Sequence, residues 1–149
     1  MRPIDMIVLH QTGTATGTVE SIRRYHMAPP PNGKGWKDIG YHYLLYADGS
    51  VHKGRPNSQV GAHCQGDNAT SLGICCVGAG DGFPVGQGYM TEPMETALLD
   101  LVELLCRAYR VPPDRIFGHR ERPSGKRQGK TCPGYEAHLV RAEMRKRGL

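Results

Sequence analysis

The sequence predicts a single α/β domain built on a mixed β-sheet. Apolar runs of strand length alternate with segments of helical periodicity, an order typical of the α/β class. The 149 residues suit one domain, and we find no internal repeat and no linker that would divide them. A composition of 38% apolar and 22% charged residues excludes a disordered or collagen-like chain. The longest nearly apolar run, 97–106, contains Asp100 and Glu103 and is too short to span a bilayer.

The N-terminal segment is predicted to hold a strand, a helix and a loop. Residues 6–9 form a short, apolar and partly β-branched run, which is typical of a buried strand that ends at His10. Thr18 is a suitable N-cap for a helix that runs to about Met27, because its hydroxyl can accept a hydrogen bond from the first turn. The proline-rich segment 28–33 must then be a loop.

A hairpin and a further strand are predicted in the middle of the chain. Residues 41–46 and 51–53 flank Asp48-Gly49, a dipeptide that favours a tight turn between antiparallel strands. Residues 72–77 form another apolar run of strand length, and the segment 78–88 is expected to be a glycine-rich loop.

The strongest helical signal begins near Thr91. Apolar side chains follow the i, i+3, i+4, i+7 spacing of one buried helix face, and they are Leu98, Leu101, Val102, Leu105 and Tyr109. A short strand over 115–117 is expected next, ending at Gly118-His119. Residues 120–131 are expected to form a basic loop, and Pro133 suits the first turn of a final helix.

The positive charge is concentrated in the last third of the chain. The formal net charge is +5, but residues 1–103 carry 7 basic and 10 acidic side chains, whereas residues 104–149 carry 12 basic and 4 acidic ones. Such a cationic segment suggests a polyanionic partner, and nucleic acid, an anionic membrane or an anionic wall polymer would all fit.

The cysteines and the N-terminus indicate synthesis in a reducing cytoplasm. The 5 cysteines include the adjacent pair Cys75-Cys76, which does not suit a secreted disulfide framework and is expected in the core. The first residues lack the apolar segment and the small-residue cleavage site of a signal peptide. We therefore expect a protein that is made in the cytoplasm and released by another agent if it acts elsewhere.

Two histidines and a cysteine form the candidate metal site. His10 and His119 both follow predicted strands, whose ends open into loops where ligands bind. Cys132 lies just before the predicted final helix, whose N-terminus would favour the thiolate. Two imidazoles and a thiolate leave a fourth position for water and favour zinc over magnesium or calcium. The 7 histidines allow many such triples, so spacing alone leaves a packed or surface role open for these residues.

An ordered set of short motifs carries a family resemblance. In chain order they are His10-Gln11-Thr12, Gly35-Trp36-Lys37-Asp38-Ile39-Gly40-Tyr41-His42-Tyr43, Asp48-Gly49, Gly61-Ala62-His63, Asn68, Ser71-Leu72-Gly73, Gly118-His119 and Lys130-Thr131-Cys132-Pro133. Together they resemble the type-2 N-acetylmuramoyl-L-alanine amidases, a family that includes peptidoglycan recognition proteins and small bacteriophage endolysins. The resemblance covers about residues 4–140, and the small size is most similar to a phage endolysin.

The resemblance implies a fold, a metal and a reaction. The fold would be a central mixed β-sheet flanked by helices, in one catalytic domain over residues 1–149 with no separate wall-binding module. His10, His119 and Cys132 match the positions that hold one Zn²⁺ in the family. The reaction would be hydrolysis of the amide between the lactyl group of N-acetylmuramic acid and L-alanine in peptidoglycan.

Further positions match catalytic and substrate-binding residues of the family. Tyr41 and Lys130 match a catalytic tyrosine and a catalytic lysine, and a fixed cation suits the oxyanion that forms during amide hydrolysis. His63 and Asn68 match residues that line the substrate groove. Trp36 is a further candidate substrate contact, because its ring could stack on a sugar. Packing or a solvated loop position stays the alternative role for these side chains.

Two other side chains compete for catalytic roles. Glu121 is a second candidate general base, ranked below Tyr41 because solvated glutamates are common in basic loops. Lys126 competes with Lys130, although the Lys-Thr-Cys-Pro spacing favours Lys130. His42 alternates with Tyr41 and is interpreted as a packed residue. The remaining histidines are expected on the surface or on helix faces; they are His26, His52 and His138.

These observations favour a zinc amidase that cleaves peptidoglycan as a phage endolysin. One alternative is a non-catalytic peptidoglycan-binding module, whose relatives commonly lack the cysteine. The other is a cytoplasmic muropeptide-recycling amidase, whose relatives typically use aspartate in its place. We expect a monomer that is made in the bacterial host and acts on the wall after release. The basic segment 141–147 would contact an anionic wall polymer or outer-membrane lipid, and no nucleic acid is expected as a partner.

Overall fold

The computed structural model describes residues 2–13, 17–78 and 90–149 and contains a five-stranded mixed β-sheet. Along the chain its strands are β1 (Met6–Gln11), β2 (Tyr43–Leu45), β3 (Val51–Lys53), β4 (Ser71–Cys76) and β5 (Ile116–Gly118). In space they follow the order β3-β2-β4-β1-β5. β1 pairs in parallel with β4 and β5, β2 pairs in parallel with β4, and β2 and β3 form an antiparallel hairpin. The predicted α/β class is confirmed, and every predicted strand is present with slightly shifted ends.

Four α-helices accompany the sheet in the part of the chain that the structure describes. They are α1 (Val19–Met27), α2 (Glu92–Tyr109), α3 (Pro123–Arg127) and α4 (Ala137–Lys146). Short 3₁₀ turns are η1 (Asn68–Thr70), η2 (Pro113–Arg115) and η3 (His119–Glu121). The predicted cap at Thr18 is confirmed, because its Oγ1 accepts a hydrogen bond from the Ser21 amide at 3.1 Å. Neither these helices nor the 3₁₀ turns of the described ranges offer a run of apolar residues long enough to cross a membrane.

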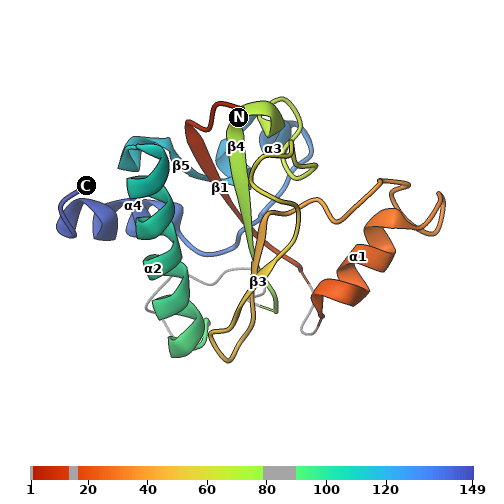
Figure 1. Cartoon of the computed structure of the whole chain (residues 1–149), viewed down its shortest axis with the longest axis horizontal. Coiled ribbons are helices and arrows are strands. Elements are labelled where there is room, and N and C mark those ends of the chain that lie inside the picture. The colour runs from red at the N-terminus through yellow and green to blue at the C-terminus, as the bar shows by residue number, and fades with distance from the viewer. Residues whose placement is uncertain (1, 14–16, 79–89) are drawn as a thin grey trace.

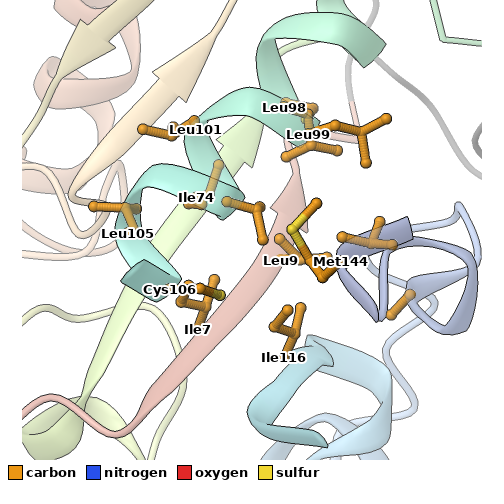
Figure 2. Close-up of a cluster of buried hydrophobic side chains, with 14 of the residues drawn as sticks. Ile7, Leu9, Ile74, Leu98, Leu99, Leu101, Leu105, Cys106, Ile116 and Met144 are labelled. Carbon is orange, nitrogen blue, oxygen red and sulfur yellow. The ribbon is translucent and has the colours of Figure 1, made fainter. Parts of the chain in front are cut away.

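One face of the sheet packs against α2 and α4 and forms the main core. The side chains of β1 alternate between the two faces, so Ile7 and Leu9 point to this layer. Figure 2 shows the cluster where α2 and α4 meet the sheet, with Leu98, Leu99, Leu101, Leu105 and Cys106 around Ile7, Leu9, Ile74, Ile116 and Met144. The predicted apolar face of the long helix therefore lies in the core.

The opposite face of the sheet carries α1 and the polar residues of β1. α1 lies across the sheet from α2 and α4 (Figure 1). Its residues Val19 and Ile22 pack on a small cluster that includes Leu44 and Cys75. His10 follows Met6 and Val8 by steps of two, so its side chain leaves β1 on the face away from the main core.

The segment between β5 and the C-terminus differs from the prediction. The expected basic loop over 120–131 contains the end of η3 and the whole of α3. The final helix begins at Ala137, so the prediction of Pro133 in its first turn is wrong. Residues 133–135 are instead buried ahead of the helix, and Tyr135 lies fully buried in the main cluster. The predicted glycine-rich loop over 78–88 lies outside the described residues except for its first glycine.

Candidate active site

The three predicted metal ligands come together at one point of the fold. Leu9 of β1 pairs with Gly118 of β5, so His10 and His119 follow as neighbours with ring centroids 4.8 Å apart. Cys132 is brought back to them by its own carbonyl, which accepts a hydrogen bond from the Arg120 amide at 2.7 Å. One ligand atom from each of the three side chains lies within 4.8 Å of the other two. Within the described residues this is the one group of three or more His, Cys, Asp and Glu side chains with such a spacing.

Burial keeps both imidazoles of this cluster in the neutral form. Desolvation lowers the pKa of His10 well below its usual value, and His63, His119 and Lys130 act in the same direction. Desolvation, followed by the charge of Lys130, also lowers the pKa of His119. Neutral imidazole is the form that binds a metal ion, so the surroundings prepare these two side chains for coordination.

The thiol of Cys132 has a different support from the one predicted. The helix that was expected to begin beside it, α4, starts at Ala137, so the helix N-terminus does not act on the sulfur as expected. The backbone amide of Gln11 lies 3.3 Å from Cys132 Sγ and can donate to it. A backbone N–H donor suits a thiolate. The strand β1 therefore provides the candidate ligand His10 and, through Gln11, a contact that stabilises Cys132.

A cleft of about 850 Å³ opens above the cluster. All eight predicted site residues line it: His10, Trp36, Tyr41, His63, Asn68, His119, Lys130 and Cys132. Residues of α1, including Ser21, Ile22 and Tyr25, also belong to the lining. The cleft therefore extends from the three candidate metal ligands to α1.

Tyr41 stands directly beside the cluster. Its ring centroid lies 5.2 Å from that of His10. Burial raises the pKa of Tyr41 well above its usual value, and the neighbouring Cys75 and Cys132 add to that effect. The side chain precedes β2 rather than lying on it, because regular pairing begins at Tyr43.

The structure separates Lys130 from its competitor. Lys130 lines the cleft, and its backbone amide donates to the carbonyl of Gly125 at 2.8 Å. Lys126 is exposed on α3 and is not among the described residues that line the cleft. Of the two lysines, the one favoured by the Lys-Thr-Cys-Pro spacing is therefore the one that lines the cleft with the candidate metal ligands.

Glu121 is engaged elsewhere, which removes it as a candidate base. Its carboxylate accepts hydrogen bonds from the Gly118 amide at 2.8 Å and from Arg141 at 3.0 and 3.1 Å. Burial acts to raise the pKa of Glu121, but the bonds from Arg141 and Gly118 outweigh it and lower that pKa. The described residues that line the cleft do not include it.

The two groove residues differ in what their side chains do. Asn68 Oδ1 accepts hydrogen bonds from the amides of His63 and Cys64, both at 2.9 Å, and so shapes the turn that carries His63. The His63 ring lies inside the protein, with Nδ1 3.0 Å from Nε2 of His10 and Nε2 3.2 Å from Ser71 Oγ. His63 therefore contacts the candidate metal ligand His10 as well as the cleft.

His26 lies on a face of α1, as expected, but that face is buried and turns toward the cleft, whereas the predictions for His42 and the cysteine pair are confirmed as made. His26 is 7% exposed, lines the cleft, and accepts a hydrogen bond from the Gly40 amide through Nδ1 at 2.9 Å. Its position on the inner side of the short α1, four residues after Ile22, was the signal that could have placed it in the cleft. His42 is fully buried and packed, as are Cys75 and Cys76.

Ser124 is a site residue that the sequence analysis missed. Its hydroxyl is fully buried and lies 3.4 Å from Nε2 of His119. It stands at the second position of α3, a helix that was expected to be a loop. The Pro-Ser pair after a basic residue is a weak helix-start signal, since proline is common in a first turn.

The other two histidines have no part in the cleft lining of the described residues: His52 stacks on Tyr46, and His138 is exposed beside Glu136.

Comparison with known proteins agrees with this arrangement. The family model described as N-acetylmuramoyl-L-alanine amidase matches residues 1–135. The endolysin of Enterobacteria phage K11 is 32% identical over 118 residues, which are 79% of this chain and 70% of that protein. The solved Ph2119 endolysin, from a Thermus scotoductus bacteriophage, has 34% identity and a TM-score of 0.74, with 95% of this chain and 84% of the other covered.

A second solved structure extends the likeness over almost the whole fold. The endolysin amidase LysCS from Clostridium intestinale has 27% identity and a TM-score of 0.78, with 97% of this chain and 85% of the other covered. The resemblance inferred from the ordered motifs is confirmed by these matches. The chain therefore belongs to the N-acetylmuramoyl-L-alanine amidase family.

Proposed function

We propose that this amidase hydrolyses the bond between the lactyl group of N-acetylmuramic acid and L-alanine in peptidoglycan, with one zinc ion held by His10, His119 and Cys132. The observation that carries the proposal is the convergence of these three donors with Tyr41 and Lys130 in one cleft. Family membership supports the reaction, and the endolysin relatives support a role in phage-induced lysis of a bacterial host.

The donor set fits a zinc ion. Cys132 Sγ lies 3.6 Å from His10 Nδ1, close to the separation of about 3.5 Å between two ligands of one tetrahedral zinc. Two nitrogen donors and one sulfur donor suit a borderline-soft ion, and three protein ligands leave one position open as in catalytic sites. When bound there, zinc would supply a nucleophile at neutral pH and a Lewis acid for the amide carbonyl.

The protein's own residues would position and polarise the substrate. Lys130 presents a cation to the carbonyl oxygen and stabilises the negative charge that develops on it. The Tyr41 ring stands beside that of His10, and its hydroxyl, which also bonds the Cys75 thiol, would donate a hydrogen bond to a group that binds there. Trp36 and Asn68 also line the cleft and would contact the sugar and peptide parts of the substrate.

The setting of the reaction follows from the same family. We infer that the enzyme is made in the host cytoplasm, acts on the wall after release, and works as a monomeric catalytic domain. The convergence of Tyr41, Lys130 and Cys132 favours catalysis over a binding module. The cysteine ligand, in place of aspartate, favours a wall lysin over a recycling amidase.

Digestion of purified peptidoglycan tests the proposal. We expect new N-terminal L-alanine groups, their loss on chelation, and their return when zinc is restored. Cys132→Ser should weaken zinc binding and abolish turnover while the fold is kept, as seen by circular dichroism. Intact sacculi after incubation with fully zinc-loaded wild-type protein would refute the amidase proposal and support a binding module.

A further inference from the structure

We propose that His63 is a positioning residue for the ligand His10, which it holds in the ring orientation and tautomer that a metal ion needs. The inference rests on the proposed function in one respect, that His10 binds zinc. It goes beyond that function because it gives His63 a part in the metal site rather than a contact with substrate alone.

The two ring nitrogens of His10 face different partners. Nδ1 lies 3.6 Å from Cys132 Sγ and therefore points toward the proposed metal site. Nε2 lies 3.0 Å from Nδ1 of His63, on the side away from that sulfur. Coordination through Nδ1 requires the proton of His10 to sit on Nε2, and from there it is donated to His63.

This assignment fixes the proton of His63 as well. Since Nδ1 of His63 accepts from His10, its proton lies on Nε2, which faces Ser71 Oγ at 3.2 Å. The His63 ring is 8% exposed and Ser71 is fully buried. Both ring nitrogens of His63 thus have partners inside the protein, an arrangement that suits a support for His10 better than a direct substrate contact.

The surroundings hold the His63 ring in a narrow slot. A Cβ atom built on Gly73 would lie 2.6 Å from Cγ of His63, and one built on Gly61 would lie 2.8 Å from its Cδ2. On the backbone side, Asn68 Oδ1 fixes the turn by accepting from the His63 amide. Two glycines and one asparagine therefore place a ring that would not fit beside larger side chains.

Zinc affinity separates the positioning role from a substrate contact. We would measure it by competition with a chromophoric chelator in wild type, His63→Asn, His63→Leu and Ser71→Ala. Asparagine and leucine have nearly the same shape, but only the asparagine oxygen can accept the hydrogen bond from His10. We expect His63→Leu to weaken zinc binding about 10- to 100-fold, His63→Asn to recover most of this loss, and Ser71→Ala to lose less than His63→Leu.

Two further measurements distinguish the outcomes. At saturating zinc, the positioning role predicts an almost unchanged KM for His63→Leu, and the absorption spectrum of the cobalt-substituted variant should shift from that of wild type. The matched control is His26→Ala, which removes another buried histidine of the cleft and should leave zinc affinity unchanged.

Zinc affinity equal to wild type in His63→Leu, together with a raised KM, would overturn the inference and leave the amidase proposal standing. Wild-type protein that binds no zinc would overturn the proposed metal site and the inference with it. If His63→Leu does not fold, Ser71→Ala decides, because unchanged zinc affinity in that variant would contradict the relay from Ser71 through His63 to His10.

Discussion

Lys130 is the cation that the protein presents beside the three candidate metal ligands. It lies two residues before Cys132, so the same short segment carries a ligand and a charge into the cleft. Its side chain is exposed, so the ammonium group stays solvated and the protein does not bear the cost of burying a charge. The charge also acts on its surroundings, because Lys130 contributes to the lowered pKa of both His10 and His119.

Replacing this lysine should reduce turnover without loss of metal. We expect Lys130→Ala to lower kcat about 100-fold, since removal of one donor to an oxyanion typically has an effect of that size. Zinc content, measured by atomic absorption, should stay at the wild-type level. Lys126→Ala is the matched control and should keep full activity; the opposite pattern in the two variants would reverse the assignment.

At the scale of elements, an ion pair joins the two segments that flank the candidate metal ligands. Arg122, which precedes α3, donates to Asp67 Oδ2 at 2.9 Å and to Oδ1 at 3.1 Å. Asp67 lies in the turn after His63, and α3 carries Ser124, which contacts His119. Both side chains of the pair are largely buried, at 20% and 14% exposure, so their interaction is poorly screened by solvent. The pair therefore ties the supports of His10 and His119 to one another.

The pair gives part of the stability a defined pH dependence. The hydrogen bond from Arg122 lowers the pKa of Asp67 in the folded protein, although burial opposes it. Because the pKa of Asp67 is lower in the folded state, the pair contributes its full share to the free energy of unfolding above the unfolded pKa of about 3.9. That share is lost as the pH falls through the folded-state pKa.

We expect Asp67→Asn to reduce the free energy of unfolding by about 1–2 kcal/mol at pH 7. The difference from wild type should shrink as the pH is lowered below about 4. Urea denaturation at several pH values measures both effects. Asp114→Asn, which breaks the exposed pair with Arg145, is the control and should change stability by less than about 0.5 kcal/mol. A constant difference at all pH values would argue against the assignment.

At the scale of the whole molecule, much of the basic C-terminal charge is bound by acidic residues of the same chain. Arg147 forms ion pairs with Asp100, Glu103 and Glu143, at 2.9, 3.0 and 3.2 Å. Arg141 binds Glu121, and Arg145 binds Asp114. The pairs of Arg147 with Asp100 and Glu103 join the end of α4 to α2, so Arg147 stabilises the packing of these two helices. A contact of 141–147 with an anionic polymer stays a prediction. Lys146 and Arg145, whose pair with Asp114 is exposed to solvent, are the residues with which to test it.

Neutralising these two cations should affect whole cells more than isolated wall. We expect Arg145→Gln with Lys146→Gln to lower activity on whole cells about fivefold for each cation that reaches an anionic surface. Activity on purified peptidoglycan should change little, and added salt should reduce the difference. Keeping Arg147 preserves its ion pairs with α2. An equal loss on both substrates would contradict a role in surface binding.

The elements and the candidate ligand set could be predicted from the sequence because their signals are local or are carried by motif order. The strand at β1, the cap at Thr18 and the apolar face of α2 follow from short periodic patterns. The three candidate ligands could be found only from the order of the motifs along the chain. The first and last of them are 122 residues apart, so no periodic pattern connects them.

The tertiary structure alone decided how the site is supported. The contact of His10 with His63 spans 53 residues, and that of Asp67 with Arg122 spans 55, so neither leaves a pattern along the chain. The start of α4 was missed because burial of Tyr135 outweighs the local preference of Pro133 for a helix start. Thus the sequence by itself determined which side chains are the candidates for the chemistry, while packing between distant segments decided which nitrogen, hydroxyl and amide hold each of them in place.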